Sequence, residues 1–176
     1  MRGAGRIIRL ASLALSFFCC GAALAQQSGC SEPPYRAFDF WMGEWEVTDN
    51  QTGNLAGSNS IRKMEDGCLL LESWSGAGGS TGTSVNYYNP VQQQWRQLWI
   101  SAGRYSIDIV GGMVGESMQL VGNIYSFNGT ASQFRGTWTP HDDGSVRQFF
   151  EQYNEETGRW DVWFDGRYVR KGEQED

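Results

Sequence analysis

The sequence predicts an all-β protein, a single antiparallel up-and-down β-barrel of about nine to ten strands. Three observations carry this prediction. Turn-forming residues recur at short, regular intervals, the segments between them are rich in Val, Ile, Tyr, Phe and Trp, and those segments alternate in polarity. Aromatic residues make up 14% of the chain and 23 residues are glycine, a combination that suits short strands and tight turns better than helices.

The turn signals are pairs and clusters of Gly, Asn and Asp, the residues that favour tight turns. They lie at 50–53, 66–67, 76–79, 89–90, 111–112, 128–129, 142–144, 157–158 and 165–166. Regular spacing of this kind is typical of an all-β sandwich or barrel.

Between the turns, side chains alternate with the period of two that a half-buried strand requires. Trp45 and Val47 share a face opposite their polar neighbours, and the same pattern recurs at 105–110 and 146–153. The only helical expectation is one short turn within 35–42. Because a closed barrel leaves no strand edge exposed, we expect the strands to join as hairpins around a closed barrel.

The first 25 residues read as a secretory signal peptide. Three arginines precede an apolar run that ends in the small-x-small triplet Ala23-Leu24-Ala25. The sequence therefore divides into a cleaved signal peptide (1–25), a flexible lead-in (26–34), one barrel domain (35–171) and a polar tail (172–176). In the lead-in, Pro33-Pro34 is expected to prevent both helix and strand pairing. The mature chain would be periplasmic or extracellular, with no membrane insertion after cleavage.

The negative net charge of the chain argues against some classes of binding partner. Loss of the three leader arginines would change the formal net charge from −6 to about −9. Nucleic acids and anionic membrane surfaces both require a basic footprint, so neither is an expected partner. A small-molecule ligand is the expected partner, and the sequence leaves the oligomeric state open.

The mature chain keeps two of the four cysteines, Cys30 and Cys68. One pair in an oxidising compartment predicts a disulfide. The alternative is a lipoprotein anchored at Cys30, because Ser28-Gly29-Cys30 is similar to the end of a lipobox, although Gln27 stands where an aliphatic residue is usual.

The triplet Gly43-Glu44-Trp45 opens the first long predicted strand. A Gly-x-Trp at this position resembles the hallmark of lipocalin-like barrels. In those barrels the indole plugs one end and an arginine of the last strand packs over it. The resemblance implies that Trp45 is the plug and that Arg170, or as second choice Arg167, is its partner.

The wider chain resembles an uncharacterised family of exported bacterial proteins with calycin-like barrels. The resemblance covers roughly residues 35–171 and implies a calycin-like fold without an established activity. It rests on the opening 38–47, Gly67-Cys68, Glu72-x-Trp74, the glycine-rich loop 76–82, Ser84-x-Asn86-x-Tyr88, Trp95-x-Gln97-x-Trp99, Val146-Arg147-Gln148 with Glu151, and the ending 164–170.

Polar and aromatic residues share several predicted strand faces, and a barrel of this size holds either packed side chains or one small ligand. Aromatic walls with a few fixed polar groups are typical of ligand pockets. We therefore expect an amphipathic or aromatic ligand in the lumen. The alternative is a non-ligand structural or interaction module with a filled core. The expected ligand-binding residues are Trp74, Asn86, Tyr88, Gln97, Trp99, Arg147 and Glu151.

A second alternative is an enzyme that acts on such a molecule. Glu72 and Glu151 are the candidate general acid or base groups, because burial raises the pKa of a carboxyl group. The sequence contains no nucleophile elbow, Cys/His pair or phosphate-binding loop. Catalysis is therefore the less favoured hypothesis.

No metal site and no cofactor is expected. His141 is the only histidine, and it lies in the turn signal 140–144. Metal sites usually gather several ligands of this kind. Haem bound through His141 and calcium bound through Asp142 and Asp143 are the disfavoured alternatives.

Overall fold

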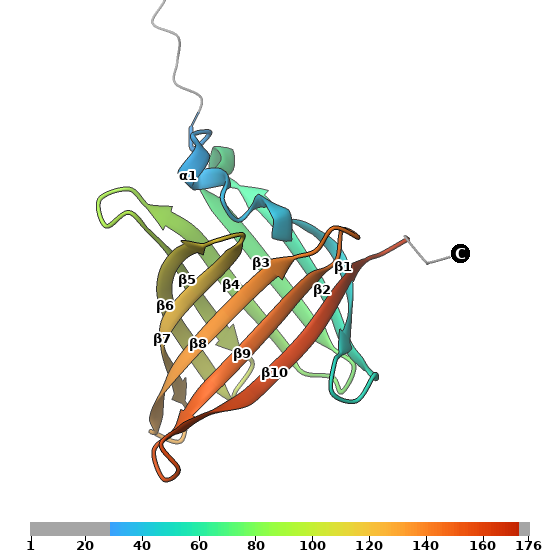
Figure 1. The fold of residues 1–176 in the computed structure, drawn as a ribbon, viewed down its shortest axis with the longest axis vertical. Helices are drawn as coiled ribbons and strands as arrows, with labels where there is room; N and C mark the ends of the chain where they lie inside the picture. The colour runs from blue at the N-terminus through green and yellow to red at the C-terminus, as the bar shows by residue number, and fades with distance from the viewer. Residues whose placement is uncertain (1–28, 173–176) are drawn as a thin grey trace, which may run out of the picture.

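The computed structural model describes residues 29–172, which form a closed ten-stranded barrel (Figure 1). The predicted signal peptide, residues 26–28 and residues 173–176 lie outside the described residues. The elements are α1 (Pro33–Arg36), η1 (Asp39–Trp41), β1 (Gly43–Asp49), β2 (Leu55–Met64), η2 (Glu65–Gly67), β3 (Leu69–Gly76), β4 (Thr81–Asn89), β5 (Gln94–Ser101), β6 (Tyr105–Val114), β7 (Ser117–Ser126), β8 (Ala131–Pro140), β9 (Val146–Asn154) and β10 (Arg159–Arg170).

Every strand pairs antiparallel with its neighbours in the chain, and β1 pairs with β10 to close the barrel. The closing register places Trp45 opposite Arg170 and Val47 opposite Tyr168. Within residues 29–172, each strand is therefore hydrogen-bonded to a neighbour on both sides, and no edge strand is left exposed. The predicted up-and-down barrel is confirmed.

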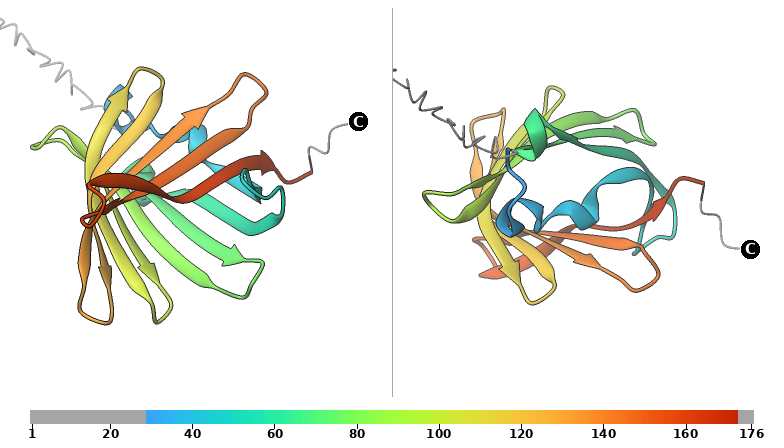
Figure 2. Two further views of the ribbon diagram at one scale, coloured as in Figure 1. Left: turned by 60° about the horizontal axis from the view of Figure 1, so that its bottom comes forward. Right: turned by 90° about the horizontal axis from the view of Figure 1, so that it is seen from above.

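The segment before β1 covers the upper end of the barrel, the end at the top of Figure 1. Seen from above, α1 and η1 cross the barrel opening (Figure 2). Phe38 and Trp41 are fully buried there, and the Phe38 ring stacks on Trp41 and packs edge-on against Trp138. Aromatic burial thus fixes the segment in place as a plug.

The expectation that Pro33-Pro34 would prevent a helix was wrong. The two prolines occupy the first positions of α1. A helix tolerates proline there because the first N–H groups have no partner within the helix, and the fixed proline φ suits helical geometry.

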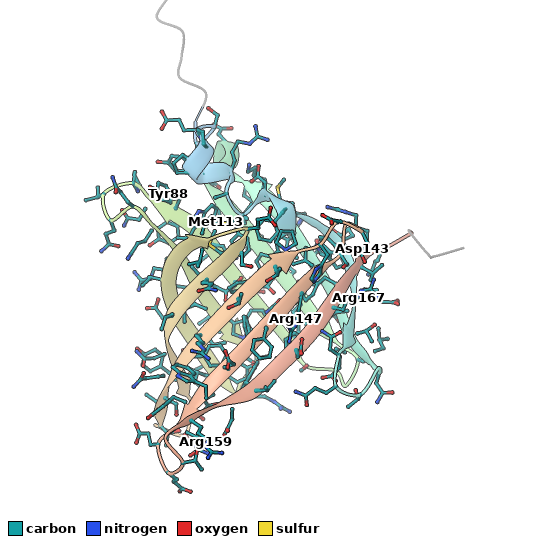
Figure 3. The ribbon with its side chains drawn as sticks, viewed as in Figure 1. Tyr88, Met113, Asp143, Arg147, Arg159 and Arg167 are labelled. Carbon is teal, nitrogen blue, oxygen red and sulfur yellow. A yellow bond between two sulfur atoms is a disulfide. The ribbon has the colours of Figure 1, made fainter. Side chains whose placement is uncertain are left out.

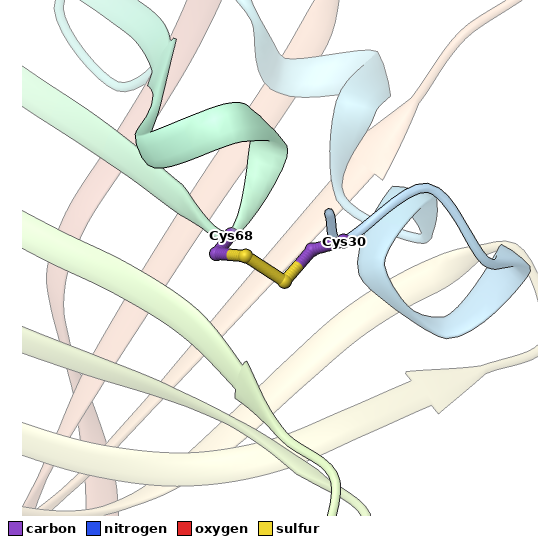
Figure 4. The surroundings of a disulfide bond; sticks show 2 residues. All are labelled: Cys30 and Cys68. Carbon is purple, nitrogen blue, oxygen red and sulfur yellow. A yellow bond between two sulfur atoms is a disulfide. The ribbon is translucent and has the colours of Figure 1, made fainter. Parts of the chain in front are cut away.

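A disulfide joins Cys30 to Cys68, as predicted (Figure 4). Cys68 lies directly before β3, so the bond ties the chain preceding the plug to the barrel wall. A disulfide is compatible with an oxidising, exported location. It also occupies the Cys30 sulfur that a lipid anchor would need.

The arrangement expected around Trp45, a buried indole beneath an arginine of the last strand, is present. The Trp45 indole is fully buried and donates from Nε1 to the Trp41 carbonyl at 2.9 Å. The Arg170 guanidinium lies over the ring, 4.5 Å from its centroid, which confirms Arg170 as the partner. Gly43 is required beside them, because a Cβ at this position would lie 2.5 Å from an Arg170 guanidinium nitrogen. Arg167, the second choice, instead donates to Asp143.

Two of the expected turns lie inside strands. Gly111-Gly112 belongs to β6, and Asp165-Gly166 belongs to β10. Close packing explains the glycine at position 111, because a Cβ there would lie 2.1 Å from the Gln119 carbonyl oxygen. The chain turns instead at Gly115, between β6 and β7.

Candidate functional site

The barrel interior changes character along its axis. On β5 the inward residues run from Trp95 at the plugged end through Gln97 to Trp99, and on β9 from Val146 through Gln148 to Phe150. An apolar layer under the plug is therefore followed by a polar layer. A second group of aromatic residues lies beyond the polar layer, toward the lower end of the barrel, which is the end opposite the plug.

Glu72 is the centre of the polar layer. It is 3% exposed, and its two carboxyl oxygens have different partners. Asn59 Nδ2 donates to Oε1 at 2.7 Å, and Ser84 Oγ donates to Oε2 at 2.5 Å. These donors come from β2 and β4, the strands on either side of β3, so the barrel register itself places both against the carboxyl group.

Amide side chains extend this layer around the wall. Asn86 Nδ2 donates to Ser84 Oγ at 2.7 Å, and Gln97 Nε2 donates to Asn86 Oδ1 at 2.9 Å. Across the lumen, the Tyr168 hydroxyl donates to Gln148 Oε1 and accepts from Asn59 Nδ2. Buried polar groups of this kind are costly unless they are paired, and most of those here are paired.

Burial raises the pKa of Glu72 from 4.5 to about 7, and the hydrogen bonds from Ser84 and Asn59 oppose this shift without cancelling it. Removal from water disfavours the ionised form because the low-dielectric interior does not solvate its charge. Burial also raises the pKa of Tyr168 well above its ordinary value. Near neutral pH, Glu72 therefore exchanges between its charged and neutral forms while Tyr168 stays neutral.

A cavity of about 240 Å³ lies between the polar layer and the lower end. Two of its lining residues, Ser80 and Trp163, are exposed, so the cavity opens to solvent at that end. Its floor is polar and its walls are mainly aromatic. The lining residues are Glu72, Trp74, Ser80, Gln97, Trp99, Tyr105, Ile107, Gln148, Phe150, Trp163, Phe164 and Tyr168.

Inward-facing glycines make room for the aromatic rings of the cavity. A Cβ on Gly82 would lie 2.1 Å from Trp99 Cζ2, and two further atoms of the same ring would lie within 2.8 Å. The Trp99 indole therefore lies directly over the Gly82 backbone. A Cβ on three other glycines would likewise lie 2.5 to 2.8 Å from a ring atom. These glycines and rings are Gly57 with Trp74, Gly136 with Phe150, and Gly166 with Phe164. The rings lie against the wall, and the lumen beside them stays open.

We expect Gly82→Ala to push the Trp99 ring into the cavity and to weaken ligand binding at least about tenfold, which corresponds to about 1.4 kcal/mol. Gly78→Ala is the matched control, because a Cβ on Gly78 meets nothing within 4 Å. Dissociation constants measured by tryptophan fluorescence for both variants would test this. Equal affinities would contradict the assigned role of the glycine.

The structure brings three of the seven expected ligand-binding residues to the cavity: Trp74, Gln97 and Trp99. Asn86 lies behind the cavity and holds Gln97 in place. Tyr88 lies at the other end of the barrel, as Figure 3 shows, where its ring packs against Tyr35 of α1. These five residues therefore divide between the cavity, the layer that supports it and the end of the barrel that packs against the plug.

Arg147 lies on the outer face of β9 (Figure 3), and Glu151 shares that face, so the two do not form the expected pair inside the lumen. Arg147 makes two hydrogen bonds to Asp165, both at 2.8 Å, and its guanidinium holds the pKa of Asp165 below the ordinary value. Glu151 accepts two hydrogen bonds from Arg135, at 2.6 and 2.8 Å. These bidentate pairs link neighbouring strands and stabilise the wall.

Eight of the twelve lining residues were not among the expected site residues: Ser80, Tyr105, Ile107, Gln148, Phe150, Trp163, Phe164 and Tyr168. For β9 a usable signal existed. The face with Val146, Gln148 and Phe150 carries no charge, whereas the opposite face carries Arg147 and Glu151. For Trp163 the alternation gave no signal, because the pairing of β10 with β9 shifts register between Val162 and Phe164.

Within residues 29–172, no group of three or more His, Cys, Asp or Glu side chains is arranged to hold a metal ion. His141 is exposed in the turn between β8 and β9. The same residues include no helix with the length and apolar character needed to cross a membrane. Comparison of the sequence with protein-family models and with curated proteins found no match.

Proposed function

We propose that the protein is exported and binds one compact, ring-containing amphipathic molecule in the cavity at the lower end of the barrel. The observation that carries the proposal is the cavity itself, about 240 Å³ in volume, with aromatic walls and a hydrogen-bonding floor. A well-packed core leaves few voids larger than a water molecule. An engineered apolar cavity of about 150 Å³ already binds benzene, so this cavity has room for a ring with a polar substituent.

Export is supported by the predicted signal peptide and by the Cys30–Cys68 disulfide. Membership of the exported calycin-like family remains part of the proposal. It rests on the motifs at 38–47 and 164–170, which form the two strands that close the barrel.

Native mass spectrometry of protein purified from its own exported fraction tests the proposal. We expect a co-purifying species of a few hundred daltons or less, present in Gly78→Ala and depleted in Gly82→Ala. If every preparation is free of small molecules and no ring compound changes the tryptophan fluorescence, a barrel filled only for structural purposes becomes the better explanation.

Glu72 also favours a second candidate function, a proton-transfer enzyme acting on the bound molecule. Its pKa of about 7 suits a general acid or base, and it lies at the cavity floor. Glu151 is less suited, because it is ion-paired to Arg135 on the outer wall. An enzyme would lose turnover in Glu72→Gln while keeping its affinity for a neutral ligand.

A further inference from the structure

The cavity lining contains an acidic side chain but no basic one. Among its twelve described lining residues, Glu72 is the only carboxyl group, and none is Arg, Lys or His. The charge of Arg104 acts on one lining residue, Tyr105, but the Arg104 side chain is exposed in the bend before that residue. A buried anion without a cationic partner is costly, so a ligand carboxylate or phosphate would be repelled from this floor.

The hydrogen-bonding groups of the floor have acceptor capacity to spare. Each Glu72 oxygen accepts one hydrogen bond from the protein, although a carboxylate oxygen offers two lone pairs. Asn59 Oδ1, in the layer behind the cavity floor, is also buried without a hydrogen-bond partner. A ligand group that donates several hydrogen bonds fits this arrangement better than one that accepts them.

The walls favour the same kind of group. Trp74, Trp99 and Trp163 line the cavity together with Tyr105, and the Trp99 ring lies flat over Gly82. One face of that indole is therefore turned toward the lumen. Aromatic faces attract cations, and the attraction is strongest for tryptophan and in desolvated sites. The formal net charge of −6 also raises the local concentration of cations around the protein.

On the basis of the proposed function, we propose that the ligand is a compact amine, bound as its ammonium ion. The ammonium group donates to Glu72 at the cavity floor, and the ring lies between the Trp74 and Trp99 walls. Three features converge on this class: a single carboxyl group, the unused lone pairs on its oxygens and the aromatic faces above it.

Binding of an ammonium ion should depend on pH, because Glu72 must be ionised to pair with it. The other titratable groups that face Glu72 are Tyr105 and Tyr168, and burial raises the pKa of both, so they stay neutral. With the pKa of Glu72 at about 7, the ionised fraction rises about tenfold from pH 6 to pH 8. Apparent affinity scales with the competent fraction, so we expect about a tenfold rise in amine affinity over this range.

Three probes of similar size separate the possibilities: 2-phenylethylamine, 2-phenylethanol and phenylacetate, titrated by calorimetry into the full mature protein. We expect 2-phenylethylamine to bind most tightly at pH 8 and phenylacetate not to bind. Glu72→Gln keeps the shape and a hydrogen-bonding amide. It should weaken amine binding at least about tenfold, abolish its pH dependence and change 2-phenylethanol binding by less than about twofold. Glu151→Gln, on the outer wall, is the control and should change neither.

If 2-phenylethanol binds as tightly as the amine, or if Glu72→Gln leaves amine binding unchanged, the amine inference is wrong and the binding function stands. If none of the three probes binds while native mass spectrometry still finds a bound molecule, the amine inference is again wrong and the binding function stands. If no ring compound binds and no molecule co-purifies, both proposals fail together. The pH profile of the unmodified protein keeps the test informative even if a Glu72 variant does not fold.

Discussion

Replacing Trp45 with alanine is expected to lower the free energy of unfolding by about 3–5 kcal/mol. The indole is fully buried at the closing seam between β1 and β10, and its loss leaves a cavity that the surrounding ladders cannot easily fill. The change also leaves the Trp41 carbonyl without its donor and Arg170 without the ring beneath its guanidinium.

Chemical denaturation followed by far-ultraviolet circular dichroism measures this cost. Trp160→Ala is the matched control, because Trp160 lies on the outer wall, where it is only partly buried beneath Arg135. We expect the control to cost about 1 kcal/mol or less. A cost below about 1 kcal/mol for Trp45→Ala would mean that the Trp45 indole does not close the end of the barrel as its position indicates.

Arg170 allows the cation–π contribution to be separated from the packing of the indole. Arg170→Met keeps a long apolar side chain over Trp45 and removes the charge. The interaction energy from a double-mutant cycle with Trp45→Phe should be about 0.5–2 kcal/mol. A value near zero would assign the whole effect to packing.

The barrel could be predicted from sequence because it depends on local signals, whereas its closing contact was implied by the resemblance to lipocalin-like barrels. Strand alternation and most turn signals involve residues that lie within a few positions of one another in the sequence. Trp45 and Arg170 lie at the two ends of the predicted domain. The disulfide followed from the two cysteines that remain after the predicted leader. Each inference needed a residue type and a place in the chain, but no register between strands.

The site was harder to predict because it depends on which strand face points inward and on which strands meet. Both faces of β9 carry aromatic residues, so Arg147 and Glu151 were placed on the wrong side of the wall. Some glycines lie on the strand next to the ring that covers them. Gly82 is diagonal to Trp99, and Gly136 is directly opposite Phe150. Such pairs become visible only when the register is known. Gly111 was taken for a turn for the same reason, whereas Gly166 lies against Phe164 of its own strand.

Glu72→Gln is expected to stabilise the protein at high pH and to have little effect at low pH. In the unfolded chain the carboxyl group has a pKa near 4.5, whereas in the folded protein burial raises it to about 7. Below pH 4.5 the group is neutral in both states and costs nothing. As the pH rises from about 4.5 to 7, the unfolded chain releases a proton that the folded protein still holds, so stability falls. Above about pH 8 the group is ionised in both states and the loss levels off.

The size of the effect follows from the pKa difference. At about 1.4 kcal/mol per pH unit, the ionisable carboxyl group costs the folded protein about 3 kcal/mol above pH 8. A glutamine carries no charge in either state. Its amide can accept from Ser84 and donate to Asn59 Oδ1 once the Asn59 amide is turned over.

The difference in unfolding free energy between Glu72→Gln and the unmodified protein should therefore grow by about 2–3 kcal/mol from pH 5 to pH 8.5. Urea titrations at several pH values measure it. Glu116→Gln is the control, since this exposed side chain lies in the turn between β6 and β7 and should give a constant difference. A difference for Glu72→Gln that shrinks with pH would mean that the carboxylate is stabilised in the folded state. The same result would remove the basis for its titration near neutral pH, on which the pH dependence of amine binding rests.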